Sequence, residues 1–238
     1  MKKIFFIILG IYSNFLFSQL YDSMYTPSGY LKIKFNKDSV AYTKDYFFNE
    51  GIYLSYEDFR KCIAVPRSLI LSRLEKNQLE FYHKLVLQQD TIVYRNGLGI
   101  NIIFTDDLFC FVQNNIVYIN VEGTFCRIPV FGNISHFIGT ISSEAFKDEG
   151  PFYEPGFAGG GSSITGNPLK SKETREFLFD FYTGKTMVAN PENMLEVIRR
   201  DSILFSEYSK LSKNQRRKKM YYYLKQYNER HSAFFPKA

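Results

Sequence analysis

Short apolar segments separated by two-residue polar breaks, between residues 91 and 141, constrain the fold more than any other feature of the sequence. Asn114-Asn115 and Glu122-Gly123 have the composition of two-residue turns that join adjacent antiparallel strands. A third turn is indicated at Arg95-Asn96-Gly97. The strands predicted around these turns are 91–94, 98–104, 108–113, 116–121 and 124–130. The pattern therefore predicts a hairpin over 91–104 and an antiparallel β-meander over 108–130.

The meander also makes a prediction about the cysteines. With the two later turns fixed, Cys110 lies opposite Ile119, and Ile119 lies opposite Cys126. Two strand spacings then separate the thiols by roughly 10 Å, whereas a disulfide needs α-carbons within about 7 Å. We therefore expect Cys110 and Cys126 to be buried as small apolar side chains and not bridged to each other. Because the cysteines number three, at least one thiol is unpaired or pairs with another chain.

The C-terminal part of the sequence carries helix signals instead. Asn190-Pro191-Glu192 combines an N-cap, a first-turn proline and an early acid. Asp201 or Ser202 caps a second short helix. Ser212 caps a third helix, which runs to about Glu229. We therefore predict an α+β fold, in which an antiparallel β-meander is followed by a C-terminal helical subdomain of two to three helices.

The domain organisation follows from length and pattern. Residues 19–238 have the length of one α+β domain. Its β-rich core is expected at about 30–189 and its helical part at about 190–231. Within the core, Tyr30–Phe35 alternates apolar side chains with lysines and predicts a strand.

Residues 67–90 fit two structures. A helical face and an alternating strand explain their apolar positions almost equally well, so helix and strand both stay open, with a helix over about 76–87 favoured. Ser72 to Glu75 resembles a capping box. Ser55 is a second expected N-cap, for a helix that ends before Pro66.

The N-terminus has the order of a secretory signal peptide. Lys2-Lys3 forms a positive region, and residues 4–11 are apolar. The small residue Ser18 precedes the expected cut, and Gln19 follows it. A membrane-spanning helix needs about 20 mostly apolar residues, and Ser13-Asn14 interrupts this stretch. We predict that residues 1–18 are removed near Ser18-Gln19. The product is then a periplasmic or extracellular protein with no transmembrane segment after cleavage.

Positive charge is concentrated at the C-terminus. The chain carries a net charge of +6, but nine Lys or Arg and one acid fall within 210–238. Such asymmetry is an argument about association rather than fold. The predicted anion-binding residues are Lys213, Arg216, Arg217, Lys218 and Lys219. They occupy the first turns of the last predicted helix, where the dipole disfavours cations. The alternative interpretation is a solvated helix face.

The sequence contains no catalytic or metal-binding signature. Residues 147–172 are rich in Gly, Pro and Ser and predict a long loop. Gly166 is followed by Asn-Pro rather than the Lys-Ser/Thr of a phosphate loop. The serines of this loop lack the hydrolase Gly-x-Ser-x-Gly frame, and the three histidines lack metal-ligand spacing. Asp106-Asp107 is first of all a turn. A Cys–His pair assembled in space stays open. We expect no cofactor and assign no catalytic or metal-binding residue.

Four segments resemble segments of small exported proteins of unknown function from Bacteroidota. They are Tyr56–Phe59, Thr124–Pro129, Phe179–Lys185 and Tyr223–His231. The signal segment, rich in Phe, Ile, Lys and Asn and followed by Gln, is also similar to that group. The likeness covers most of the mature chain. It implies no activity, and no residue role follows from it.

Three hypotheses of function remain. The leading one is a non-enzymatic binding or envelope-associated module. The second is a hydrolase acting on envelope or scavenged polymer, with its site near the 147–172 loop. The third is binding of an anionic envelope surface through the basic C-terminal helix. Another envelope protein is a further partner class, and nucleic acid is disfavoured for an exported chain.

Overall fold

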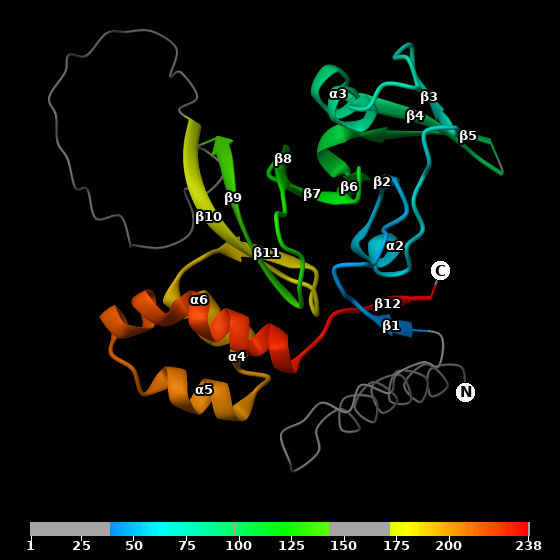
Figure 1. Cartoon of the computed structure of the whole chain (residues 1–238). Helices are drawn as coiled ribbons and strands as arrows, with labels where there is room; N and C mark the ends of the chain where they lie inside the picture. Colours follow the sequence, from blue (N-terminus) through cyan, green and yellow to red (C-terminus); the bar gives the residue numbers. More distant parts are fainter. Residues whose placement is uncertain (1–38, 98, 143–171, 238) are drawn as a thin grey trace, which may run out of the picture. The chain divides into compact units, whose positions relative to one another are not determined.

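The computed structural model describes residues 39–97, 99–142 and 172–237 of the chain, which has helices and antiparallel sheets as the α+β prediction requires (Figure 1). The predicted signal peptide, the predicted strand at 30–35 and residues 147–171 of the predicted loop lie outside the described residues. The chain divides into two compact units. The first is residues 41–189. The second consists, among the described residues, of 39–40 and 190–237.

The first unit contains the predicted meander. Its sheet has the order β2 (Gly51–Tyr53), β6 (Cys110–Gln113), β7 (Ile116–Val121) and β8 (Thr124–Arg127). Both connecting turns have positive φ at both central residues, from 50° at Glu122 to 78° at Gly123. This is the backbone that matches the twist of paired strands. The two predicted turns are therefore confirmed.

The cysteine register is confirmed as well. Cys110 pairs with Ile119, and Ile119 pairs with Cys126. Both cysteines are buried, and all three cysteines of the chain, including Cys62, are free thiols. A close backbone approach at Gly139 helps to enclose Cys126, since a β-carbon at Gly139 would lie 2.5 Å from the sulfur.

A second antiparallel sheet of the same unit has the order β3 (Ile70–Leu71), β4 (Thr91–Asn96) and β5 (Gly99–Phe104). Helix α3 (Phe81–Gln88) packs on one face of it (Figure 1). The core between them is formed by side chains at alternating positions of the strands and by side chains along one face of the helix. Its members include Ile70, Ile92, Tyr94, Phe81, Tyr82 and Leu85.

The ambiguous stretch 67–90 therefore contains both a strand and a helix. The predicted helix start near residue 76 is wrong, because α3 begins at Phe81. Ser72 does not cap a helix; its Oγ accepts from the Leu74 amide within a turn. The first turn of α3 is satisfied instead from a distant strand, since Gln113 Oε1 accepts from the Tyr82 amide at 2.9 Å.

The third sheet of the unit has the order β11 (Lys185–Val188), β10 (Lys172–Asp180) and β9 (Ile134–Ser142). The hairpin turn after β10 contains Gly184, whose φ is +74° and which lies against the ring of Tyr56. Tyr56 opens α2 (Tyr56–Arg60), which Ser55 caps as predicted, and its hydroxyl donates to the Phe181 carbonyl. Between β5 and β6 lies the 3-10 turn η1 (Thr105–Asp107).

The second unit is mainly helical. It contains α4 (Pro191–Ile198), α5 (Ser202–Ser209), α6 (Lys213–Arg230) and β12 (Phe234–Pro236), which pairs with β1 (Ser39–Ala41). The predicted caps are confirmed. The side chain of Asn190 accepts from the Asn193 amide at the start of α4. Asp201 accepts from the amides of Ile203 and Leu204 at the start of α5. Ser212 forms a full capping box with Gln215 at the start of α6.

Candidate functional site

The predicted anion-binding residues lie in the first two turns of α6, and the structure divides them. Lys213, Arg217, Lys218 and Lys219 are exposed. Arg216 is half-buried, and its Nε donates to the Leu211 carbonyl at 3.2 Å. Its own carbonyl accepts from the Tyr208 hydroxyl at 3.0 Å. Arg216 therefore joins α6 to α5, while the other four residues present charge to solvent.

Tyrosines extend this basic face along the helix. Tyr221 follows Arg217 by four residues, and Tyr222 follows Lys218 by four, so each ring lies on the same side of α6 as a cation. The two rings are 43% and 59% exposed. Basic side chains next to exposed tyrosines are typical of helices that lie on an anionic interface. Sequence reasoning identified the cations and missed the tyrosines.

No thiol in the structure has the character of a nucleophile. Burial raises the pKa of Cys62, Cys110 and Cys126, and that of Cys126 reaches about 11. Cys62 also lies 3.0 Å from the Tyr46 hydroxyl, a contact that opposes the rise without cancelling it. A catalytic cysteine requires a lowered pKa. Burial therefore disfavours a nucleophilic role for these three thiols.

The three histidines have different partners on different elements. His83 packs its ring near Tyr118 on β7, with centroids 5.7 Å apart. His136 Nε2 lies 3.6 Å from Glu176 on the neighbouring strand. His231 Nε2 lies 2.9 Å from Asp201 Oδ2, while Oδ1 of the same carboxylate caps α5. Within the described residues, no three His, Cys, Asp or Glu side chains are placed to hold a metal ion.

Asp106 and Asp107 form a turn, as predicted, and also line an open hollow of about 630 Å³. The turn is held by Asn120, whose Nδ2 donates to the Asp106 carbonyl at 2.7 Å and whose Oδ1 accepts from the Gly123 amide. Both carboxylates are exposed. The hollow therefore has acidic walls formed by this turn.

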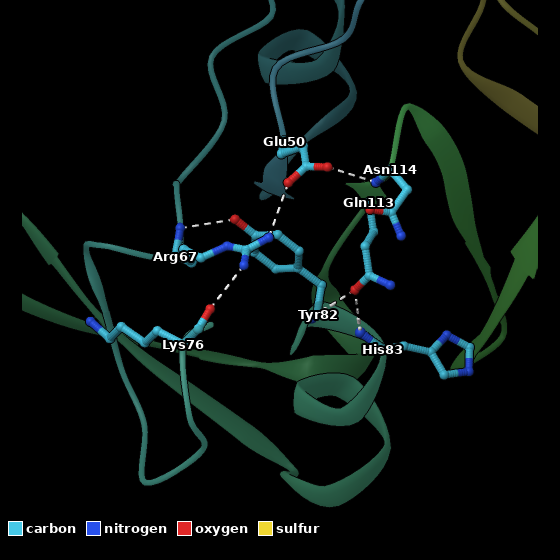
Figure 2. A network of polar contacts seen from close by, with 7 residues as sticks. All are labelled: Glu50, Arg67, Lys76, Tyr82, His83, Gln113 and Asn114. Atoms are coloured by element: carbon cyan, nitrogen blue, oxygen red, sulfur yellow. Dashed lines mark hydrogen bonds and ion pairs between the residues drawn. The ribbon is translucent and has the colours of Figure 1, made fainter. Parts of the chain in front are cut away.

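A polar network fixes the second sheet to the meander (Figure 2). Glu50 accepts from the Asn114 amide at 2.7 Å and from Arg67 Nη2 at 3.0 Å. Arg67 also donates from Nη1 to the Lys76 carbonyl and from its amide to the Tyr82 hydroxyl. The guanidinium lies over the Tyr82 ring, 5.4 Å from its centroid. These contacts hold the segment between β3 and α3.

Gln113 completes the network from the end of β6. Its side chain is buried, and its Oε1 accepts from the amides of Tyr82 and His83 at 2.9 and 3.2 Å. The His83 ring points away from this contact (Figure 2). One side chain of the meander thus caps α3 and thereby sets the position of the helix against β3, β4 and β5. The network is structural, and we call the sheet of β3, β4 and β5 that it joins to the meander the platform.

The face of that platform opposite α3 is apolar. Pairing places alternate residues of the three strands together: Leu71 opposite Val93, and Val93 opposite Ile102. We call this set the outer face; it consists of Leu69, Leu71, Val93, Ile100, Ile102 and Phe104. Ile100, Ile102 and Phe104 are 66%, 68% and 63% exposed. An antiparallel sheet with one covered face normally presents polar side chains on the other. Here the outer face is mainly apolar, although Thr91 and the exposed Arg95 of β4 lie on the same side as Val93.

Sequence reasoning missed the outer face. The signal was present in residues 99–104, where Ile100, Ile102, Ile103 and Phe104 leave no alternation between apolar and polar positions. An apolar strand of this kind is also consistent with burial on both sides. Only the sheet order shows that β5 is at an edge and that α3 covers one face alone.

No protein-family model, curated protein or solved structure matches the chain. Among the described residues, no helix is both long and apolar enough to span a membrane. The competing hydrolase site near 147–172 falls, except for Lys172, outside the described residues.

Proposed function

We propose that this chain is a non-enzymatic binding module, exported from the cytoplasm, that captures an apolar protein partner on the outer face. The observation that carries the proposal is the exposure of Ile100, Ile102 and Phe104 on a sheet whose opposite face is already covered by α3. Exposed apolar patches larger than scattered single residues mark interaction sites on soluble proteins.

The energetics favour a covered outer face. Burying one large aliphatic or aromatic side chain stabilises a structure by roughly 1.5–3 kcal/mol. Three such side chains stand next to one another at alternate positions of β5. A partner that covers them gains that free energy without any rearrangement of the platform, because Gln113 and Arg67 already hold it in place.

The experiment is site-specific photo-cross-linking in the cells that make the protein. A benzophenone amino acid replaces Ile102 in one variant and Ile138 in the control. Ile138 is also an exposed strand isoleucine, 58% accessible, but it lies on the separate sheet of β9. We expect one discrete adduct from position 102, lost when Ile100 is also changed to Lys, and none from position 138. No adduct at 102, or equal adducts at both positions, contradicts the proposal.

Export is part of the same proposal and has its own readout. The mature N-terminus is expected at Gln19, so the intact mass of the exported protein lacks residues 1–18. A retained Met1 on protein purified from the periplasm or medium overturns the predicted cleavage.

The second candidate function is binding of an anionic envelope surface through α6. It is favoured by the shared helix side of Arg217, Lys218, Tyr221 and Tyr222. Each basic residue near an anionic lipid surface contributes about 1 kcal/mol. This surface and the outer face belong to different units of the chain.

A further inference from the structure

The direction of the backbone groups of β5 follows from its pairing. The Thr105 amide donates to the Asp90 carbonyl at 2.8 Å, and this pair continues the β4–β5 register by one residue. Opposed residues in an antiparallel ladder alternate between bonded and non-bonded pairs. Asn101 and Ile103 therefore bond to β4, whereas Ile100, Ile102 and Phe104 direct their N–H and C=O groups away from it. On the other side of β4, the Arg95 amide donates to the Leu69 carbonyl on β3, which fits the same alternation.

The same three residues therefore combine two features. Their side chains are exposed on the outer face, and their backbone donors and acceptors point to the outer edge of the sheet. The sequence of the strand carries none of the devices that normally block such an edge. It contains no charged residue and no proline, and its one-to-one register with β4 has no bulge.

We propose that β5 accepts an extended segment of a partner protein as a fourth strand of this sheet, with apolar side chains at every second position of that segment. The inference rests on the proposed binding function and adds the chemical form of the partner. Main-chain hydrogen bonds to residues 100, 102 and 104 supply affinity, and the outer face selects the apolar side chains.

The size of the outer face favours a strand over a second folded copy. Ile100, Ile102, Phe104 and Leu69 are 39–68% exposed. At roughly 150–200 Å² for a fully exposed side chain, they leave on the order of 400 Å² uncovered. A stable interface between folded proteins buries about 800 Å² on each side. One extended segment matches the smaller area.

Charges at the two ends of β5 favour one orientation. Arg95 is exposed and pairs with Ile100 at the start of the strand, while Asp106 and Asp107 follow Phe104 at its end. An antiparallel partner segment runs from the Asp end to the Arg end. It is therefore best complemented by a basic residue at its own N-terminal end and an acidic residue at its C-terminal end.

The test uses a fluorescent synthetic peptide in which three valines alternate with threonines, with Lys at the N-terminus and Glu at the C-terminus, and the purified full mature chain. Residues directly opposite in a bonded pair share a face, so the valine amides point at β5 and the threonine amides point away. N-methylation of the valine amides should weaken binding at least about tenfold. N-methylation of the threonine amides should leave it unchanged.

Two controls accompany the peptide series. Ile102→Lys should abolish binding, and Ile138→Lys, at a comparably exposed strand position, should not; unchanged melting temperatures of both variants establish that they fold. A peptide with Lys and Glu exchanged should bind several-fold more weakly, and equal binding overturns the antiparallel orientation.

Equal effects of the two N-methylation patterns overturn strand addition. If the cross-link at position 102 is nevertheless obtained, the proposed binding function stands, but the partner does not bind as an added strand. Dimerisation of the chain through β5 that the peptide does not displace overturns the choice of partner.

Discussion

Ile102 on β5 lies directly opposite Val93 on β4, and both side chains project from the face of the sheet that α3 leaves uncovered. Val93 lies in turn opposite Leu71 on β3, so an apolar row crosses all three strands. A row of this kind is ordinary in the interior of a protein. Exposed apolar patches are typical of interaction sites, and we propose that another molecule covers this one.

The two faces of the sheet should respond differently to the same substitution. Ile92→Thr places a hydroxyl in the core under α3 and should lower the free energy of unfolding by at least about 2 kcal/mol. Ile102→Thr keeps the β-branched shape on the exposed face and should change the free energy of unfolding by less than about 0.5 kcal/mol. Urea denaturation measures both. A large loss at Ile102 indicates that the outer face is already covered in the isolated chain.

The buried side-chain amide of Gln113 should contribute to the free energy of unfolding by capping α3. Gln113→Leu removes the acceptor for the Tyr82 and His83 amides and leaves buried donors unpaired. The expected cost is about 1–3 kcal/mol of unfolding free energy. Gln88→Leu, at the exposed end of the same helix, is the matched control and should be close to neutral. Equal effects of the two changes would show that α3 does not depend on this cap.

The stability of the helical unit should depend on pH, because Asp201 is charged only above its pKa. Burial raises the pKa of Asp201, but the Leu204 amide, His231 and Arg230 outweigh it, so the pKa lies below its ordinary value. A lowered pKa means that the charged form is stabilised by folding. The contribution is therefore present above about pH 4, the unfolded value, and is lost as pH falls through the folded pKa.

Asp201→Asn isolates this charge, because the amide oxygen still caps α5. We expect the variant to be less stable than the parent by about 1 kcal/mol near pH 7. The difference should shrink below about pH 4, where the parent also loses its charge. Thermal unfolding across pH 3–7 measures it, and a difference independent of pH contradicts the assignment.

The basic residues of α6 should separate into a binding group and a structural one. Arg217→Gln with Lys218→Gln should reduce retention on vesicles containing anionic lipid and lower its salt dependence, without loss of stability. Arg216→Gln should lower stability instead, because it removes the contact with the Leu211 carbonyl. Co-sedimentation and thermal unfolding distinguish the two. Retention that is the same for parent and double variant rules out this surface.

Local patterns predicted the parts of the fold that local chemistry determines. The turns at Asn114-Asn115 and Glu122-Gly123 require an unusual backbone that few residue types adopt, so the meander and the register of Cys110 and Cys126 could be derived. The start of α3 could not be derived, because its cap is Gln113, from a distant strand.

The candidate surface was invisible for a similar reason. Residues 99–104 have the composition of a strand buried on both faces. Whether a strand is central or at an edge depends on its neighbours in space, and the sequence contains no local signal for the order β3-β4-β5. The different roles of Arg216 and Arg217 likewise depend on the contact between Arg216 and the Leu211 carbonyl. The charge pattern alone does not show this contact.

The most direct test of the central claim, that β5 is an open edge that receives a partner strand, is amide hydrogen exchange at Ile102 and Ile103 by NMR. In the free chain, the Ile103 amide should be protected by its bond to β4, and the Ile102 amide should exchange freely. On saturation with the alternating valine–threonine peptide, Ile102 should become protected by at least about tenfold while Ile103 changes little. An Ile102 amide already protected in the free chain, or one that the bound peptide leaves unprotected, contradicts the account.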